Sequence, residues 1–391
     1  MKHIFYINPA AGSKNAPLTL IPEIRRACEE ASVDYSVHVT STASEMLDSI
    51  RREAANETPF RVYACGGDGT LNRALHGVAG VTHAELAHIP CGTGNDFVRN
   101  FTHPAYFLDI RRQLCGKAIQ LDAIRIGDPA GDATGDAIRI GDPAGDSISN
   151  PAGDAISIGD PAGGSTSNPA GDAIRIGDPA GDATGDAISI GGPAGDSISD
   201  AAVDSISDPA GDSLALNMVN IGVDSDVVAL AGRLKRYPFL KGSLAYGAAA
   251  IRVLMQGKTY RMHIEFDDGT TSEEDLFLIG IANGRFCGGG FLSAPRASLT
   301  DGLLDICAIR PVRGVKEAKL LATYRKGTHL DNPAYANDII YRRCKELQIE
   351  ARDPVTMAVD GEVVELKRVT LRILPGAVRF SIPQGAATIN A

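Results

Sequence analysis

Short apolar segments alternate with amphipathic segments through the first third of the chain, and this alternation limits the possible folds more than any other feature. The periodicity predicts strands over 3–8, 35–40, 60–65 and 86–89. It predicts helices over 17–31, 44–55 and 71–78, with another helix beginning at Asp96. Strands that alternate with helices pair in parallel, because each helix carries the chain back across the sheet. The sequence therefore predicts an α/β domain with a parallel sheet covered by helices.

Three glycine-rich elements each follow one of these strands. They occupy residues 8–13 (NPAAGS), 66–72 (GGDGTLN) and 90–97 (PCGTGNDF). The carboxyl ends of parallel strands meet at one edge of a sheet, where ligands bind. Glycines let the backbone approach a phosphate, helix N-termini supply donors, and Thr70, Thr93 and Asn95 can add side-chain hydrogen bonds. None of the elements matches a Walker loop or the G-x-G-x-x-G fingerprint, so a phosphate site of another kind is expected.

A degenerate repeat occupies residues 128–212. Residues 122–145 recur as 172–195 with 22 of 24 positions identical. The tract holds sixteen aspartates, two arginines and neither glutamate nor lysine, so the net charge is −10 with it and +4 without it. It has no aromatic residue and is rich in Gly, Pro and Ser, so it buries little apolar surface to offset the entropy of ordering. We expect disorder; the alternative is a β-solenoid with stacked Ile-x-Ile pairs, such as Ile124 and Ile126, and Ca²⁺-binding aspartates.

The segments on either side of the tract, 118–124 and 213–222, both have the pattern of strands. The simplest interpretation is a repeat expanded at the tip of a hairpin, since loop-closure entropy grows slowly with loop length. A chain of 391 residues usually forms two domains. We expect an α/β domain over 1–117 and a β-rich domain formed by 118–127 together with 213–391. The repeat at 128–212 is expected to be an insert in the second domain.

Two hairpins support a β-rich second domain. Alternating residues at 260–266 and 275–281 flank the turn sequence Asp-Asp-Gly-Thr at 267–270. Residues 357–366 form another hairpin around Asp360-Gly361. The last strands can also pack back on the first domain.

The chain lacks the usual signals of secretion and membrane insertion. No apolar run approaches the ~18 residues of a spanning helix, and the N-terminal residues lack the pattern of a signal peptide. The seven cysteines form no C-x-x-C pair, which favours reduced thiols in the core over disulfides or a zinc site. We expect a cytoplasmic protein with no transmembrane segment and no nucleic-acid partner, and a homodimer is compatible with the sequence.

At this point the residues resemble the diacylglycerol kinase catalytic family, and specifically its bacterial soluble lipid kinases. The three glycine-rich elements match N-P-x-x-G, G-G-D-G-T-x-N and P-x-G-T-x-N-D-F in the correct order. Further matches follow the insert, at residues 220–224, 283–290, 294–297, 301–305 and 360–362. The resemblance implies an α/β nucleotide domain like that of NAD kinases and a β-sandwich second domain, with ATP bound in the cleft.

The resemblance also implies roles for individual residues. The ATP-binding residues would be Asn8, Pro9, Ala10, Ala11, Gly12, Thr40, Gly66, Gly67, Asp68, Gly69, Thr70, Leu71, Asn72, Thr93 and Asn95, of which Thr93 closes the site. Mg²⁺ would be organised through water by Asp68, Asp96 and Asp122. A second Mg²⁺ would bind Asp301 and the backbone carbonyls of Ser298 and Leu303. Glu362 matches the proton acceptor, with Asp360 as a second candidate; phosphoryl transfer needs such a carboxylate, together with positioning and charge neutralisation.

Several of these residues also have a plain structural interpretation. Taken alone, Asp360-Gly-Glu362 and Asp301-Gly302 are turn sequences, and only the companion motifs favour their catalytic and metal-binding roles. Asp305 is interpreted as structural. The segment 83–88 contains two histidines without the H-E-x-x-H spacing, so surface histidines are expected rather than zinc ligands.

We therefore expect an ATP- and Mg²⁺-dependent lipid kinase that converts diacylglycerol to phosphatidic acid at the membrane surface. Residues 233–241 mix four cations with aromatic and aliphatic side chains, as in a surface that contacts anionic headgroups or in a solvated helix end. NAD kinase, and kinases for phosphatidylglycerol, a sphingoid base or a polyprenol, are the enzymatic alternatives. A scaffold protein that acts through the repeat tract is the alternative from another class.

Overall fold

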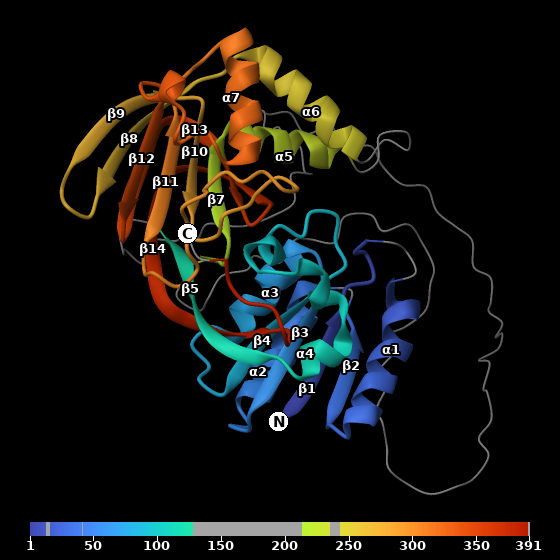
Figure 1. Ribbon diagram of the computed structural model, residues 1–391. Coiled ribbons are helices and arrows are strands. Elements are labelled where there is room, and N and C mark those ends of the chain that lie inside the picture. Colours follow the sequence, from blue (N-terminus) through green and yellow to red (C-terminus); the bar gives the residue numbers. More distant parts are fainter. Residues whose placement is uncertain (13–15, 41, 128–212, 235–242, 390–391) are drawn as a thin grey trace, which may run out of the picture. The chain divides into compact units, whose positions relative to one another are not determined.

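The computed structural model describes residues 1–12, 16–40, 42–127, 213–234 and 243–389 (Figure 1). The repeat tract, with its interpretations as a disordered segment or a Ca²⁺-binding β-solenoid, lies outside the described residues. Most of the cationic segment at 233–241 also lies outside them. The fold that positions the candidate site is formed by the residues before and after the tract.

Four parallel strands form the N-terminal sheet, as the sequence predicts. Every residue of the two strands β3 and β4 is buried, which is what helices on both faces of a parallel sheet produce. The three glycine-rich elements follow β1, β3 and β4, so their predicted place at one edge is confirmed. The strand order is β2–β1–β3–β4, with β1 at Lys2–Ile7, β2 at Tyr35–Val39, β3 at Phe60–Gly66 and β4 at Ala84–Pro90.

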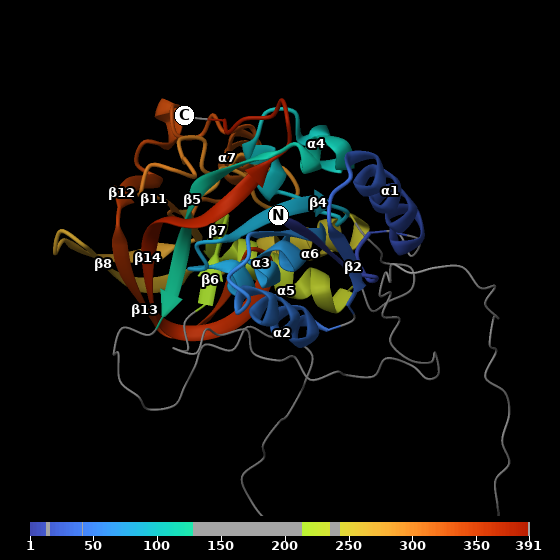
Figure 2. The ribbon, with the colours of Figure 1, turned by 90° about the horizontal axis from the view of Figure 1, so that it is seen from below.

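Helices cover both faces of this sheet (Figures 1 and 2). Ile24 and Cys28 of α1 pack with Ile110 of α4 on one apolar cluster. Ile50 of α2 and Leu75 of α3 belong to the cluster on the other face. These side chains repeat at helical spacing, which is why the pattern predicts the helices correctly. The helices are α1 (Ala16–Ala31), α2 (Ala43–Ala54), α3 (Asp68–Val78) and α4 (Ile110–Leu114).

The segment after the third glycine-rich element differs from the prediction. Instead of a helix beginning at Asp96, two 3₁₀ turns follow, η1 at Phe97–Asn100 and η2 at Pro104–Leu108. Asp96 makes no capping hydrogen bond, because its carboxylate accepts the amide of Gly289 instead. Proline at position 104 has no amide hydrogen with which to continue a helix. The segment between these two residues is too short for a stable α-helix.

The two segments that flank the repeat tract pair with each other. β5 (Lys117–Gly127) and β6 (Ser213–Ala215) are antiparallel, with Ile126 opposite Ser213. β7 (Met218–Gly222) follows and joins the second group of strands. The strand predictions on both sides of the tract are confirmed. The tract connects the end of β5 to the start of β6, which are neighbours in one antiparallel pair.

Deleting residues 128–211 and joining β5 to β6 through a short turn is expected to leave the described fold intact. The paired ends have hairpin spacing, which a loop of about two to five residues can close. Circular dichroism and thermal unfolding of the shortened protein measure the outcome. Loss of the cooperative transition would show that the tract contributes to the folded core.

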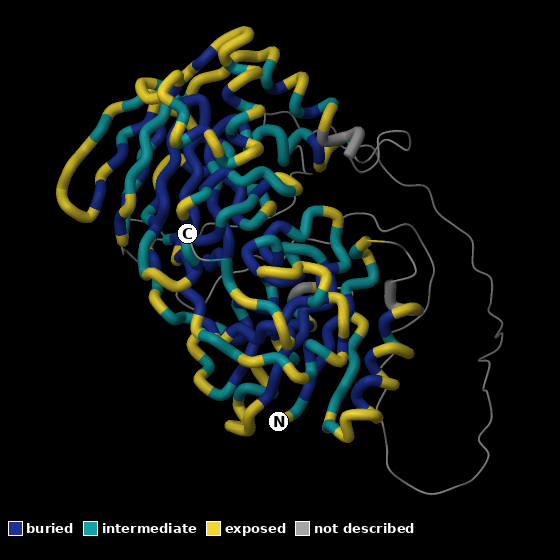
Figure 3. Tube along the Cα trace, in the orientation of Figure 1, coloured by how far each residue is buried: buried dark blue, intermediate teal, exposed yellow. Residues whose placement is uncertain are grey.

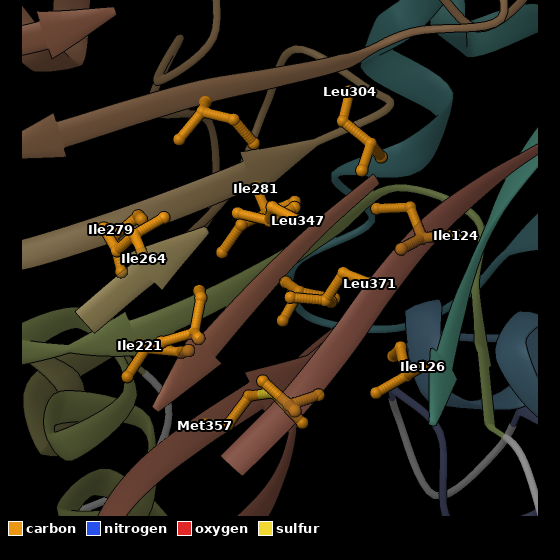
Figure 4. Close-up of a cluster of buried hydrophobic side chains, with 14 of the residues drawn as sticks. Ile124, Ile126, Ile221, Ile264, Ile279, Ile281, Leu304, Leu347, Met357 and Leu371 are labelled. Atoms are coloured by element: carbon orange, nitrogen blue, oxygen red, sulfur yellow. The ribbon is translucent and has the colours of Figure 1, made fainter. Parts of the chain in front are cut away.

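Antiparallel strands of the C-terminal part enclose an apolar core (Figure 4). Ile221, Ile281 and Met357 come from three different strands and lie together in it. Ile124 and Ile126 of β5 belong to the same core, so these two are sheet residues rather than members of a solenoid stack. The strands are β8 (Tyr260–Phe266), β9 (Thr271–Leu276), β10 (Leu278–Ala282), β11 (Leu304–Ile309), β12 (Ile339–Cys344), β13 (Glu346–Val359) and β14 (Glu362–Ile382).

One of the two predicted hairpins has a different second strand. β8 pairs with β9, which ends at Leu276, and not with a strand over 275–281. The amide of Phe277 donates to Ile309, and β10 then runs between β7 and β11. The burial patterns explain the break, since β9 alternates like an edge strand while every residue of β10 is buried.

The long strand β14 pairs with strands of both groups. Its first part pairs with β13 across the turn at Asp360-Gly361, which confirms the second predicted hairpin. Its later part runs beside β5, as Figure 2 shows. Phe380, near its end, pairs with Leu86 of β4 in the parallel sheet. The turn at Asp360 is thereby held close to the N-terminal sheet.

Three helices pack on the second group of strands. Val253 of α6 and Leu320 of α7 are buried in a cluster with Phe277. The outer sides of α6 and α7 are largely exposed (Figure 3). The helices are α5 (Val223–Leu234), α6 (Ser243–Gln256) and α7 (Val315–Lys326).

All seven cysteines lie in the described residues as free thiols. Cys115 is exposed and Cys91 is half-buried. The other five are buried, so the prediction that most are core residues is confirmed.

Candidate nucleotide and catalytic site

The three glycine-rich elements pack against one another through their backbones. A Cβ atom on Gly12 would lie 2.1 Å from the carbonyl oxygen of Cys91, and one on Gly92 would lie 2.4 Å from the Cα atom of Gly67. No side chain fits at either distance, and Gly12 also has a φ of +62°. The elements form one backbone surface at the sheet edge, next to the N-terminus of α3.

Asn8 joins the first element to the second. Its side-chain amide donates to Oγ1 of Thr70 at 3.0 Å, and its Oδ1 accepts the amide of Ala10 at 2.9 Å. The amide of Ala11 donates to the carbonyl of Asn8 at 3.1 Å and closes the turn that contains Pro9. These bonds fix the first element beside the start of α3, where the sequence predicts a phosphate site.

Asp68 begins α3 and holds the third element in place. Its Oδ2 accepts the amide of Asp96 at 3.1 Å, and its Oδ1 accepts the amide of Phe97 at 3.2 Å. A Cβ atom on Gly94 would lie 3.2 Å from the same carboxylate. Asp68 and Asp96 therefore lie together, and both belong to the surface that the three elements form.

The carboxylate of Asp96 is buried and contacts the second group of strands. Its Oδ2 accepts the amide of Gly289 at 2.8 Å, while its Oδ1 lies 3.3 Å from Nε of Arg99 without a hydrogen bond to any described residue. Burial raises the pKa of Asp96, although the neighbouring backbone amides act in the opposite direction. This oxygen, which only the ion pair with Arg99 holds, is a group that a hydrated cation can also bind.

Glu362 lies over the second glycine-rich element. Its Oε1 is 3.2 Å from the guanidinium of Arg73 and 3.0 Å from the place that a Cβ atom on Gly69 would occupy. Because glycine at position 69 has no side chain, the carboxylate of Glu362 can lie this close to the backbone of α3. The side chain of Glu362 is 21% exposed, so a substrate can reach it. This carboxylate faces the backbone surface of the loops and also contacts solvent.

Asp360 is an anchor within the fold rather than an open carboxylate. Its φ of +46° lies in the left-handed region. Burial raises the pKa of Asp360, and its hydrogen-bond donors oppose that rise. With both oxygens engaged, Asp360 is poorly suited to take a proton from a substrate. The donors are the side chain of Asn72 and the amides of Leu216, Asn217 and Met218.

Replacing Asp360 by Asn is expected to destabilise the fold. The new NH₂ group would face backbone N–H donors, and each buried donor that loses its acceptor costs about 1–3 kcal/mol. The turn that carries Glu362 would also lose its anchor, so the rate of phosphate transfer should fall. Thermal unfolding and the assay proposed below measure both effects, with the exposed Asp353→Asn as the control. Unchanged unfolding of Asp360→Asn would show that these four bonds are dispensable.

Residues of α3 that were predicted to contact ATP join this helix to β6. Asn72 is buried and donates to the carbonyl of Leu214 at 2.8 Å. The amide of Leu214 donates to Nε2 of His76 at 3.0 Å. Leu71 is a buried member of the apolar core. Asn72 and Leu71 therefore position the helix, and in α3 the loop surface consists of the backbone at the N-terminus of the helix.

Three further predicted ATP residues, Asn95, Thr93 and Thr40, lie in the third element and after β2. Asn95 has a φ of +51° and exchanges two hydrogen bonds with the backbone of Gly92, so it shapes the third element. Thr93 is exposed at the tip of that element. Thr40 is half-buried beyond β2, where its amide donates to Ile7. Thr93 and Thr40 thus remain available to a ligand.

Asp122 does not join Asp68 and Asp96. Within the described residues no hydrogen bond or ion pair links it to either of them, because Asp122 lies on β5, which pairs with β14 and β6 and not with β1–β4. Its carboxylate accepts the amides of Gly302 at 2.7 Å and Gly376 at 2.8 Å. Burial is the largest influence on Asp122 and raises its pKa. Asp122 therefore stabilises the turn before β11 and does not contact the glycine-rich elements through a hydrogen bond among the described residues.

The predicted second metal site lies in that turn. Oδ1 of Asp301 accepts the amide of Leu303 at 3.2 Å, and its Oδ2 lies 3.6 Å from the guanidinium of Arg343. Ser298 is half-buried three residues before Asp301. The described residues contain no group of three or more His, Cys, Asp or Glu that could hold a metal. Mg²⁺ at either site would depend on water, backbone carbonyls or substrate phosphates besides one or two carboxylates.

The prediction of surface histidines at 83–88 is wrong for His88. This residue is fully buried in β4, with Nε2 3.2 Å from the carbonyl oxygen of Gly66 and Nδ1 without a partner among the described residues. Burial lowers the pKa of His88, so a neutral imidazole supports the second element from below. Because β4 is covered on both faces, its residue pattern does not reveal which side chains are exposed.

Two residues of the site were not predicted from the sequence. Arg73 follows Gly69 by four residues on α3, and this spacing could have placed its side chain above Gly69. Gly289 lies within a run of three glycines with positive φ, at 288–290. That run indicates a tight turn, but nothing local identifies Asp96 as its partner.

The fold and the site define a class of protein in which a parallel α/β domain presents glycine-rich loops to a β-rich domain. The sequence matches the family described as "Diacylglycerol kinase catalytic domain" over residues 2–126 and the family described as "YegS C-terminal NAD kinase beta sandwich-like domain" over 217–382. The chain thus contains a diacylglycerol kinase catalytic domain followed by a C-terminal domain of the YegS type. The two matches lie on opposite sides of the repeat tract, and they confirm the predicted fold class.

Curated relatives carry the name "Probable lipid kinase YegS-like". One from Stenotrophomonas maltophilia is 32% identical over 118 residues, which cover 30% of this chain and 37% of the relative. One from Pseudomonas aeruginosa is 30% identical over 185 residues, which cover 45% of this chain and 56% of the relative. The chain thus spans about a third to a little over half of the length of these relatives.

A solved structure described as a diacylglycerol kinase from Bacillus anthracis str. Sterne has a similar fold. The TM-score is 0.56 at 16% sequence identity, and the match covers 98% of this chain and 97% of the other. At this identity the likeness concerns the fold alone.

Proposed function

We propose that this chain is an ATP-dependent lipid kinase with diacylglycerol as the acceptor and phosphatidic acid as the product. The observation that carries the proposal is the place of Glu362, whose Oε1 lies beside Gly69 at the N-terminal end of α3. A carboxylate at this point can take the proton of a hydroxyl that attacks a phosphate held by the loops. The names of the curated relatives support a lipid as the acceptor.

The residues present fit ATP and Mg²⁺. Gly12, Gly67 and Gly92 let the three elements pack into one backbone surface, from whose amides a polyphosphate can accept hydrogen bonds. Asp68 and Oδ1 of Asp96, which makes no hydrogen bond to a described residue, would hold the ion through water. Bound together, Mg-ATP would supply the γ-phosphoryl group and neutralise part of its charge.

Glu362 serves as the general base in this proposal. It accepts the proton of the lipid hydroxyl, whose oxygen forms a bond to the γ-phosphorus while the bond from phosphorus to the ADP oxygen breaks. Arg73 holds the carboxylate in place through the 3.2 Å ion pair. Asp360 fixes the turn from which Glu362 projects, since it binds α3 through Asn72.

The alternative acceptors, in place of diacylglycerol, are NAD, phosphatidylglycerol, a sphingoid base and a polyprenol. The non-enzymatic alternative is a scaffold protein that acts through the repeat tract. A lipid acceptor would bring the protein to the membrane surface as a peripheral enzyme. Among the described residues, no helix is long and apolar enough to cross a membrane.

An acceptor panel tests the proposal. The full-length protein is given Mg-ATP and, one at a time, diacylglycerol, phosphatidylglycerol, sphingosine, a polyprenol and NAD. The proposal predicts the highest kcat/KM for diacylglycerol. A preference for another lipid would correct the substrate, and phosphorylation of NAD alone would contradict a lipid kinase.

A further inference from the structure

The outer faces of α6 and α7 combine exposed apolar side chains with unpaired cations. Ile251 and Met255 of α6 are 64% and 82% exposed, and Val315 at the start of α7 is 72% exposed. Ile251 and Met255 are four residues apart and therefore share one helix face. We define the α6–α7 patch as these three residues with the cations Arg252, Arg313 and Lys319.

The patch is continuous between the two helices. Met255 and Arg313 line one surface hollow of about 320 Å³, which brings the end of α6 next to the start of α7. The other large apolar side chains with high exposure in the described residues are Met1, Val39 and Leu108, all in the N-terminal part. In the C-terminal part, the large exposed apolar side chains are thus concentrated on α6 and α7, and such a patch is typical of an interaction surface.

The charge of this face is positive. Arg252, Arg313 and Lys319 form no ion pair with another described residue. The acid of α7, Glu317, is half-buried and lines the same hollow as Met255 and Arg313, so it offsets one of the charges. Along α7 the exposed residues include four cations and no acid, and one of the cations, Lys316, pairs with Asp338 at 2.5 Å. The exposed residues are Val315, Lys316, Ala318, Lys319, Ala322, Arg325 and Lys326.

α7 connects the patch to the candidate site. A helix of twelve residues is about 18 Å long. At its far end the guanidinium of Arg325 lies 5.6 Å from the ring centroid of Phe291, and the carbonyl of Arg325 accepts the amide of Leu292. Phe291 follows the glycine turn whose Gly289 amide binds Asp96. The patch at the start of α7 is therefore about one helix length from the segment that binds Asp96.

We propose that the α6–α7 patch docks on a bilayer that contains anionic phospholipids. The apolar side chains enter the headgroup boundary, and the cations contact the lipid phosphates. The inference rests on the proposed function, because a lipid hydroxyl must be reached where the bilayer meets water. Charge complementarity favours the bilayer over a second copy of the chain, since two copies of a cationic patch without an exposed acid repel each other.

Sedimentation with vesicles tests the docking. Full-length protein is expected to bind vesicles of phosphatidylcholine and phosphatidylglycerol in equal parts, and to bind phosphatidylcholine vesicles far less. Changing both Arg313→Glu and Lys319→Glu should weaken binding to the anionic vesicles by about tenfold or more. Changing both Ile251→Ser and Met255→Ser should weaken it as well. Lys117→Glu, an exposed cation at the start of β5, is the matched control and should bind like the original protein.

A water-soluble short-chain diacylglycerol separates docking from catalysis. The patch variants should phosphorylate this acceptor at the original rate and lose activity only on diacylglycerol in anionic vesicles. If the original protein binds these vesicles through the patch but phosphorylates no lipid, the proposed function fails and the docking stands. Undiminished sedimentation of both double variants would overturn the docking. Light scattering gives a second test. If the original protein is a dimer and both double variants are monomers, the docking is also overturned, because the patch would then be a contact between copies.

Discussion

Glu362→Gln is expected to slow phosphate transfer to diacylglycerol by about 10²- to 10⁴-fold, the usual contribution of a general base. The amide has nearly the same size and can stay beside Gly69, but it cannot take the proton of the hydroxyl. Because the side chain is partly exposed, the free energy of unfolding should change little. Initial rates at saturating Mg-ATP, with thermal unfolding of the same samples, measure both quantities.

Glu365→Gln is the matched control for this substitution. Glu365 lies on the same strand, β14, three residues further along, and is exposed. Its loss should leave the rate unchanged, because it lies outside the loop surface. A Glu362→Gln protein with the original rate would assign the base to another group and remove the main support for the proposed chemistry.

Gly92→Ala is expected to separate the second and third glycine-rich elements. The new Cβ atom would lie 2.4 Å from the Cα atom of Gly67 and 3.0 Å from Oδ1 of Asn95. The first of these neighbours is backbone and cannot rotate away. Overpacking of this kind costs about 1–3 kcal/mol of stability. The affinity for ATP should fall by about tenfold or more, since the shared surface of amides would be lost.

Isothermal titration with ATP and thermal unfolding measure the two effects of Gly92→Ala. Gly232→Ala is the control, because Gly232 lies in α5 and no atom stands within 4 Å of the place of its Cβ. Alanine there should keep or slightly raise the stability, by up to about 1 kcal/mol. Unchanged ATP affinity in Gly92→Ala would show that the close approach of the two elements is not required for nucleotide binding.

The parts of the fold that the sequence predicts correctly depend on local signals. β1, β3 and β4 are short apolar runs, and the amphipathic segments between them form helices that cover the sheet. Asp360-Gly361 has the composition of a tight turn and lies in one. Gly12 stands where φ is positive and where no Cβ atom fits, so its element could be placed from residue type alone.

The parts that the sequence does not predict depend on partners far along the chain. Asp122 binds amides 180 and 254 residues away, at Gly302 and Gly376. Asp360 binds Leu216, which is 144 residues away. Asp96 was expected to begin a helix, but the amide of Gly289 engages its carboxylate instead. No periodicity or turn preference encodes such contacts, which appear only when the strands are assembled.

The most direct test of the account is the transfer of labelled γ-phosphate from Mg-ATP to diacylglycerol in mixed micelles, measured with the full-length protein and with Glu362→Gln in parallel. The account predicts labelled phosphatidic acid from the first protein and almost none from the second. Folded protein that labels neither diacylglycerol nor any other lipid, or that labels both samples equally, would contradict it.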